Sequence, residues 1–155
     1  MSKPIDAMKE ATYLAYKAGS QGEIPIGAII VKNNKIISKA YNKREKSQIA
    51  THHAEILAIQ KACKKLKSWR LDDCDLYVTL EPCPMCAGAI INARIKNVYY
   101  AVIDEPSGGI SRFNLLTNTL NHTTNSFHLK EYEQENKTLI QNFFKDKRKN
   151  NRKTK

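Results

Sequence analysis

The sequence has no long hydrophobic run. Its longest dense apolar stretch, residues 24–31 (IPIGAIIV), has the length of a single strand, whereas a membrane-spanning helix needs about 20 apolar residues. The first ten residues, MSKPIDAMKE, contain nothing like the apolar core of a secretory signal. We therefore expect a protein that does not interact with a membrane and that is located in the cytoplasm.

Cysteine is also scarce, with four in 155 residues, and structural disulfides are rare in the cytosol. Cys63 and Cys74 show no metal-ligand spacing, and we interpret both as ordinary small side chains. Cys83 and Cys86 are separated by two residues in EPCPMC. That spacing alone leaves a metal site, a disulfide and a redox pair open.

Acidic residues are few relative to basic ones. The 15 Asp and Glu against 26 Lys and Arg give a net charge of +11, which favours an anionic partner, most often a nucleic acid. The alternative is an AT-rich genome that overuses Lys and Asn. Much of the excess lies in residues 145–155, KDKRKNNRKTK, and lysine-rich tails are often merely solvated.

The chain contains no internal repeat and no Gly/Ser linker, and its length suits one domain. We expect a single domain over residues 1–149 and a basic, flexible tail over 150–155. Hydrophobic periodicity predicts helices over 4–19, 53–66, 84–95 and about 131–149, and strands over 24–31, 35–42, 74–80 and 97–103. Loops are expected at 43–51 and 104–128, the second with room for a short strand. This alternation predicts a layered α/β fold whose two inner helices share one face of a mixed sheet.

Two of the predicted helices begin at potential metal ligands. His53 begins one, and the Cys83–Cys86 pair begins the next, both at the same end of the predicted sheet. One nitrogen and two thiolates match Zn²⁺. A structural zinc site has four protein ligands, but Cys63 would lie about 15 Å along its helix from His53, and Cys74 lies at the far end of a strand. We therefore expect an open coordination position for water.

Glu55 follows His53 by two residues. A carboxylate beside an open zinc position suits hydrolysis, because zinc lowers the pKa of a bound water to about 7 and the carboxylate can carry its proton to a leaving group. The alternative is that Glu55 only stabilises a helix N-terminus. His52 is expected to point roughly 100° away around the helix. The remaining histidines, His122 and His128, lack metal spacing and are interpreted as surface or RNA-facing groups.

The motif His-Ala-Glu at 53–55 followed by Pro-Cys-Pro-Met-Cys at 82–86 is the signature of zinc-dependent nucleoside and nucleobase deaminases. Other stretches extend the likeness: IPIGAIIV, residues 68–90 (SWRLDDCDLYVTLEPCPMCAGAI), and FFKDKR at 143–148. Over nearly its whole length the chain resembles the bacterial tRNA-specific adenosine deaminases, members of the cytidine/deoxycytidylate deaminase superfamily.

The resemblance implies a three-layer α/β/α, cytidine deaminase-like fold with a central mixed sheet of about five strands. It implies hydrolytic deamination of adenosine to inosine at the wobble position of a tRNA anticodon stem-loop, carried out by a homodimer. One Zn²⁺ per subunit would be held by His53, Cys83 and Cys86, and Glu55 would be the proton shuttle.

The resemblance also assigns substrate contacts. Four residues would contact the target nucleotide or its neighbour: Asn42 hydrogen-bonds the purine, Ile26 lines the pocket, the Ala54 backbone faces the substrate, and Asp104 lies near the preceding ribose. The basic residues of the last helix, Lys145, Lys147 and Arg148, would approach the RNA backbone.

The sequence departs from the family pattern near the expected pocket. His52 replaces a small residue, Pro106 replaces a lysine, and the loop at 109–115 is shorter than usual, which puts phosphate contacts from residues 104–112 in question. Two alternatives remain open. A free-base guanine deaminase shares the His-Ala-Glu and Pro-Cys motifs, and a noncatalytic tRNA-binding subunit would keep only a structural zinc, although such proteins typically lose the glutamate that Glu55 supplies here.

Overall fold

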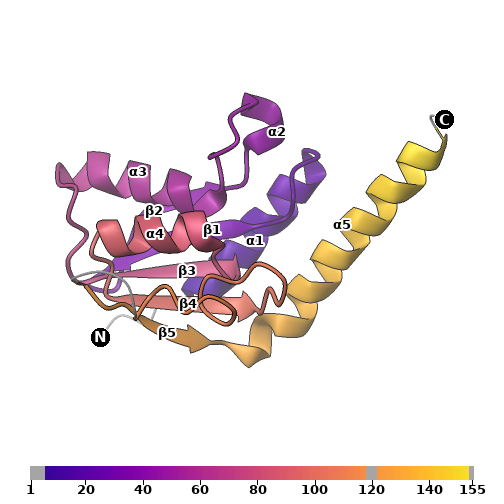
Figure 1. Cartoon of the computed structure of the whole chain (residues 1–155). Coiled ribbons are helices and arrows are strands. Elements are labelled where there is room, and N and C mark those ends of the chain that lie inside the picture. Colours follow the sequence, from indigo (N-terminus) through magenta and orange to yellow (C-terminus); the bar gives the residue numbers. More distant parts are fainter. Residues whose placement is uncertain (1–5, 118–121, 154–155) are drawn as a thin grey trace.

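The computed structural model describes residues 6–117 and 122–153 (Figure 1). One sheet has the strand order β2-β1-β3-β4-β5. Its strands are β1 (Gly27–Lys32), β2 (Lys35–Tyr41), β3 (Cys74–Leu80), β4 (Asn97–Val102) and β5 (Asn125–His128). Strand β1 is antiparallel to β2 and β3, whereas β3, β4 and β5 are parallel. The predicted α/β fold with a mixed five-stranded sheet is confirmed.

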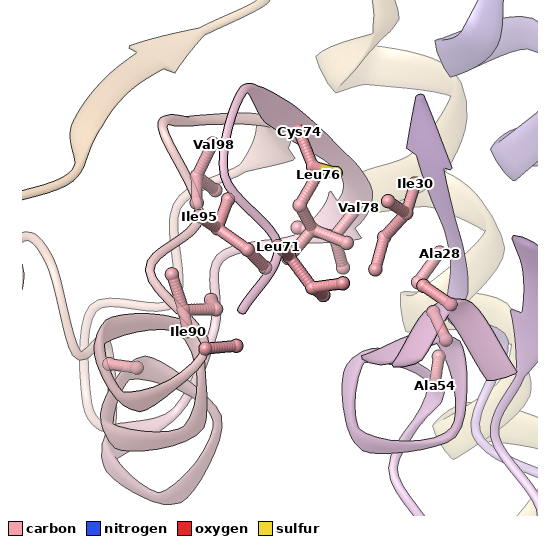
Figure 2. Packing of buried hydrophobic residues seen from close by; sticks show 14 of the residues in the cluster. Ala28, Ile30, Ala54, Leu71, Cys74, Leu76, Val78, Ile90, Ile95 and Val98 are labelled. Atoms are coloured by element: carbon pink, nitrogen blue, oxygen red, sulfur yellow. The ribbon is translucent and has the colours of Figure 1, made fainter. Parts of the chain in front are cut away.

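Helices cover both faces of the sheet. Helices α3 (Ala54–Leu66) and α4 (Pro84–Asn92) pack on one face, where their alanines and isoleucines meet strand residues such as Leu76 and Val78 in the larger core cluster (Figure 2). Helix α1 (Ala7–Ser20) packs on the other face in a second cluster around Ile29. The two inner helices therefore share one face, as predicted.

The turn between β1 and β2 follows directly from its sequence. Asn33 and Asn34 have φ angles of 51° and 58°, and asparagine tolerates this left-handed region better than most residues. A two-residue turn with both φ angles positive matches the right-handed twist of the flanking strands. The two strands predicted on either side of this turn are therefore antiparallel neighbours in the sheet.

Several predicted boundaries were wrong for local reasons. The strand expected at 24–31 begins only at Gly27, because Pro25 lacks an N–H and Ile26 N–H donates to the Ile24 carbonyl at 2.8 Å. The helix expected at 84–95 ends at Asn92, since Arg94 has a φ of 65°. The expected loop at 43–51 contains a short helix, α2 (Arg44–Ser47).

The C-terminal part also differs in detail. Strand β5 is the short strand for which the loop predicted at 104–128 left room, and a short 3-10 helix, η1 (Lys130–Tyr132), leads into α5 (Glu133–Lys153). Helix α5 is longer than expected and includes residues 150–153, and its second half extends away from the rest of the chain (Figure 1). The flexibility expected of residues 150–155 stays a prediction. Residues 1–5, including the predicted helix start at Pro4, lie outside the described part. Among the helices described, none is both long enough and apolar enough to cross a membrane.

Candidate active site

The candidate metal ligands lie at two helix starts. His53 is the N-cap of α3 and Cys83 is the N-cap of α4, each with extended backbone angles. Pro84 occupies the first turn of α4, where its missing N–H has no helical partner to lose. Because α3 and α4 run side by side on one face of the sheet (Figure 1), their N-termini bring His53 next to Cys83, and Cys86 lies one turn further into α4.

The three side chains have a geometry that fits a tetrahedral zinc. Their ligand atoms all lie within 4.8 Å of one another, and His53 Nδ1 is 3.6 Å from Cys83 Sγ and 3.6 Å from Cys86 Sγ. Zinc bonds of about 2.3 Å to sulfur and about 2.1 Å to nitrogen at tetrahedral angles place S and N about 3.6 Å apart. The set therefore fits a metal with one further position left for a non-protein ligand.

The two thiols of the cluster differ in how readily they ionise. A hydrogen bond from Cys86 is the main cause that lowers the pKa of Cys83 to about 4, with His53 acting in the same direction. The pKa of Cys86 is raised, first by this contact with Cys83 and then by burial. Thiolate is the form of cysteine that binds metals, so the lowered pKa of Cys83 favours binding, whereas Cys86 must release its proton to the solvent when a metal binds.

Glu55 is the buried acid of this cluster. Its side chain is 4% exposed, and burial is the main cause that raises its pKa to about 7. Within the described residues its Oε1 atom is buried and has no hydrogen-bond partner. Buried polar atoms are normally paired, so this oxygen indicates a missing ligand or water in the cluster. A carboxyl group with a pKa near neutrality can both accept and return a proton.

A cavity of about 640 Å³ opens above the cluster. Its wall includes His53, Glu55 and Cys83, together with three residues predicted to contact the substrate, Ile26, Asn42 and Asp104. The Asn42 side chain is 3% exposed and its backbone N–H donates to the Ile26 carbonyl at 3.1 Å. The structure therefore gathers these residues in one pocket, and their contacts with substrate stay predictions.

One wall of the cavity was missed in the sequence. Helix α5 contributes one face to it, made of Lys137, Ile140, Gln141 and Phe144. These positions are three or four residues apart, which is the spacing of one helix face. The periodicity predicted the helix but contained no signal that it packs beside residues almost a hundred positions earlier. Arg44, at the start of α2, also lines the cavity, although only a polar loop was expected there.

Other predicted residues lie outside this pocket. Lys145, Lys147 and Arg148 are exposed on α5 beyond Phe144, so their RNA contacts stay a prediction. Ala54, the first residue of α3, is fully buried, and the contact of its backbone with substrate stays a prediction.

The structure places two of the residues that depart from the family pattern, Pro106 and His52. Pro106 lines the cavity. His52 is half-buried, and its carbonyl accepts from Lys43 N–H at 3.1 Å. His122 and His128 are half-buried, and their rings pair with the carbonyls of Ile95 and Ala101 at 2.8 and 2.9 Å. Both side chains thus take part in the fold, and an RNA contact by either one stays a prediction.

Comparison with known proteins agrees with this site. The model of the MafB19-like deaminase family matches residues 3–148. A tRNA-specific adenosine deaminase from Bacillus subtilis is 53% identical over 104 residues, which cover 67% of this chain and 64% of that protein. One from Aquifex aeolicus is 45% identical over 147 residues, covering 92% and 95%.

A solved structure has the same architecture. It comes from a study of A-to-I editing by tRNA:A34 deaminases at the wobble position of transfer RNA, and it superposes with a TM-score of 0.80 at 38% identity, covering 85% of this chain and 96% of its own. Matches of this extent, together with the His/Cys/Cys cluster and its buried glutamate, identify the protein as an enzyme. The chain belongs to the MafB19-like deaminase family, among the tRNA-specific adenosine deaminases.

Proposed function

We propose that the protein deaminates adenosine to inosine at the wobble position of tRNA anticodons. The observation that carries this proposal is the position of Glu55, a buried carboxyl with a pKa of about 7 and an unpaired oxygen, beside three metal ligands in the wall of a cavity. The relatives named for the same activity support the choice of substrate.

We propose one Zn²⁺ per subunit, held by His53, Cys83 and Cys86. When bound, zinc supplies Lewis acidity that lowers the pKa of a water ligand to about 7. The net reaction adds water at C6 of adenine and releases ammonia. Glu55 accepts one proton of the water and donates it to N1 of the ring. It then accepts the remaining proton from the new hydroxyl group on C6 and donates it to the amino group, which departs as ammonia. A pKa near neutrality suits both halves of this task.

The cavity supplies binding and orientation. Its volume lies within the range of about 300–1,000 Å³ that small-molecule sites occupy, which accommodates one nucleoside. Ile26 would pack on the purine and Asn42 would hydrogen-bond its edge, since both line the cavity next to Glu55. An anticodon loop is largely unpaired, so turning one base into the cavity costs less than extracting it from a duplex.

We also propose contacts between α5 and the RNA outside the cavity. The exposed residues Lys145, Lys147 and Arg148 on the outward half of α5 would neutralise phosphates of the anticodon stem. Basic side chains of this kind give affinity without sequence preference. The homodimer, which rests on the resemblance alone, and the cytoplasmic location, which was expected from the sequence, remain predictions.

Sequencing a bulk tRNA pool after incubation with the zinc-loaded enzyme tests the proposal. We expect A-to-G changes at wobble adenosines, because inosine is copied as guanosine, and no changes with Glu55→Ala. The same protein is assayed on free guanine, which the alternative guanine deaminase would hydrolyse. Activity on guanine together with an unedited tRNA pool would reject the proposal.

A further inference from the structure

Glu81 is a buried acid that takes no part in the proposed proton transfers. It follows the end of β3 and precedes Cys83 by two residues. Its side chain is 1% exposed although it borders the cavity, so it has almost no surface with which to touch a substrate. Burying a carboxylate is costly unless its oxygens are well paired, and the partners therefore indicate what the residue does.

All hydrogen-bond partners found for the Glu81 carboxylate lie in residues 104–111. Oε1 accepts from Asp104 N–H at 3.2 Å, and Oε2 accepts from the N–H groups of Ile110 and Ser111 at 2.9 and 2.6 Å. The Ser111 hydroxyl lies 2.8 Å from Oε1 and 3.0 Å from Oε2. One carboxylate thus ties together both ends of this segment, whose middle residues 105–107 line the cavity.

The glycines of the segment show how closely it packs on Glu81. A Cβ atom on Gly108 would lie 2.2 Å from Glu81 Oε2, and one on Gly109 would lie 2.8 Å from Ala87 Cβ. Gly109 N–H also donates to the Pro82 carbonyl at 2.8 Å. The segment is therefore seated directly on the loop that carries the metal ligands, with no room for a side chain in between.

We propose that Glu81 is a positioning residue that fixes the 104–111 wall of the cavity, and with it Asp104, in the conformation that receives the substrate. This wall is where the sequence departs from its family at Pro106 and in the short loop that follows. Because the Glu81 carboxylate binds backbone N–H groups, it can hold this wall even where an exposed side chain such as Pro106 differs from the family pattern. For its effect on RNA, this inference rests on the proposed function.

The chemistry of the site predicts which substitutions release the wall. Glu81→Gln keeps the shape but replaces one acceptor oxygen with an NH₂ group, which faces backbone N–H donors and leaves at least one of them unpaired. Gly108→Ala keeps the Glu81 carboxylate but forces it out of place, because the new methyl would occupy its position. One substitution alters the carboxylate and the other alters the segment that it binds, so we expect both to loosen residues 104–111. Glu10→Gln, at an exposed glutamate paired with Lys39 at 3.4 Å, is the matched control.

The test measures hydrogen exchange of residues 104–111, zinc content, and kinetics on an anticodon stem-loop RNA, all in the zinc-loaded protein. For both Glu81→Gln and Gly108→Ala we expect exchange at Asp104, Ile110 and Ser111 to accelerate about tenfold or more, which corresponds to one lost hydrogen bond. Zinc content should stay at the wild-type level. KM should rise about tenfold with a much smaller change in kcat, the pattern of lost binding shared by ground and transition states. Glu10→Gln should change none of these.

Unchanged exchange in both variants would overturn the inference, as would faster exchange with an unchanged KM. Loss of zinc would also overturn it, because Glu81 would then act through Cys83. If Glu81→Gln does not fold, the same measurements on Gly108→Ala test the inference. Ser111→Ala removes only the hydroxyl donor and should raise the exchange rate and KM by smaller factors. If the wild type leaves the RNA unedited, the proposed function fails, while the exchange measurement still decides whether Glu81 holds the wall.

Discussion

The Asn136 side-chain amide donates a hydrogen bond to Thr12 Oγ1 at 3.0 Å, joining α5 to α1 across 124 positions of sequence. Both side chains are buried. Two contacts nearby connect the same helices or their flanks, Tyr16 with Glu135 at 3.1 Å and Tyr132 with Asp6. This polar junction sets where α5 leaves the sheet, and therefore where its cavity-lining face lies.

Thr12→Val tests this junction. The change keeps the side-chain shape but removes the acceptor of the Asn136 amide, so a buried donor is left without that partner. We expect a loss of about 1–3 kcal/mol in the free energy of unfolding, measured by urea denaturation, and a weaker affinity for the stem-loop because α5 is less firmly placed. Thr117→Val, at an exposed threonine paired with Asn114 at 2.7 Å, should leave both quantities nearly unchanged.

Glu55→Ala should abolish inosine formation while zinc and RNA binding persist. Proton transfer by a positioned side chain contributes typically 10²–10⁴-fold, and we expect kcat on the stem-loop to fall by at least this factor. Metal analysis and a filter-binding assay on the same sample separate catalysis from assembly. Deamination that continues in this variant would defeat the assigned role of Glu55.

The raised pKa of Glu55 predicts a dependence of stability on pH. Its pKa rises from 4.5 to about 7 because the carboxyl is buried, so the folded protein holds this proton more tightly than the unfolded chain does. The resulting stability is complete below the unfolded pKa of 4.5 and is lost as pH rises to about 7. In metal-free protein, Glu55→Gln should therefore gain stability relative to wild type between about pH 5 and 8, by up to about 3 kcal/mol. A difference that is independent of pH would show that Glu55 is not shifted.

The basic residues of α5 predict a salt-sensitive affinity for RNA. Raising salt from about 50 to 200 mM should weaken stem-loop binding strongly, and Arg148→Ala should reduce the slope of log affinity against log salt by about 1 if it contacts one phosphate. Gln134→Ala, near the other end of α5, should leave the slope unchanged. Equal slopes for wild type and Arg148→Ala would contradict a phosphate contact by Arg148.

The parts of the site that lie next to helix starts could be predicted from the local sequence. His53 and Cys83 were recognisable because each precedes an apolar helix and follows a loop or strand at the same sheet end, and alternating helices and strands bring such positions together. The cavity wall from α5 was not recognisable. Its position depends on buried contacts such as the one between Asn136 and Thr12, and one residue of such a pair contains no information about the other.

The segment at 104–111 was unpredictable for a different reason. It has no periodicity, because its conformation is determined by backbone N–H groups that converge on Glu81. Backbone donors are present at every position except proline, so they leave no trace in the side-chain pattern. The only local sequence signal is the pair Gly108-Gly109. The structure explains it, because a side chain at Gly108 would collide with the Glu81 carboxylate.

Helix α5 runs without interruption from the cavity wall at Phe144 to the basic residues that follow. Arg148 follows Phe144 by four positions, which amounts to about 6 Å of axial rise and slightly more than one turn. Arg148 therefore lies on nearly the same side of α5 as Phe144. A single inserted residue between them would turn every basic side chain by about 100° while leaving the cavity intact. If these side chains bind the stem as proposed, α5 sets the distance and the angle between the base in the cavity and that stem.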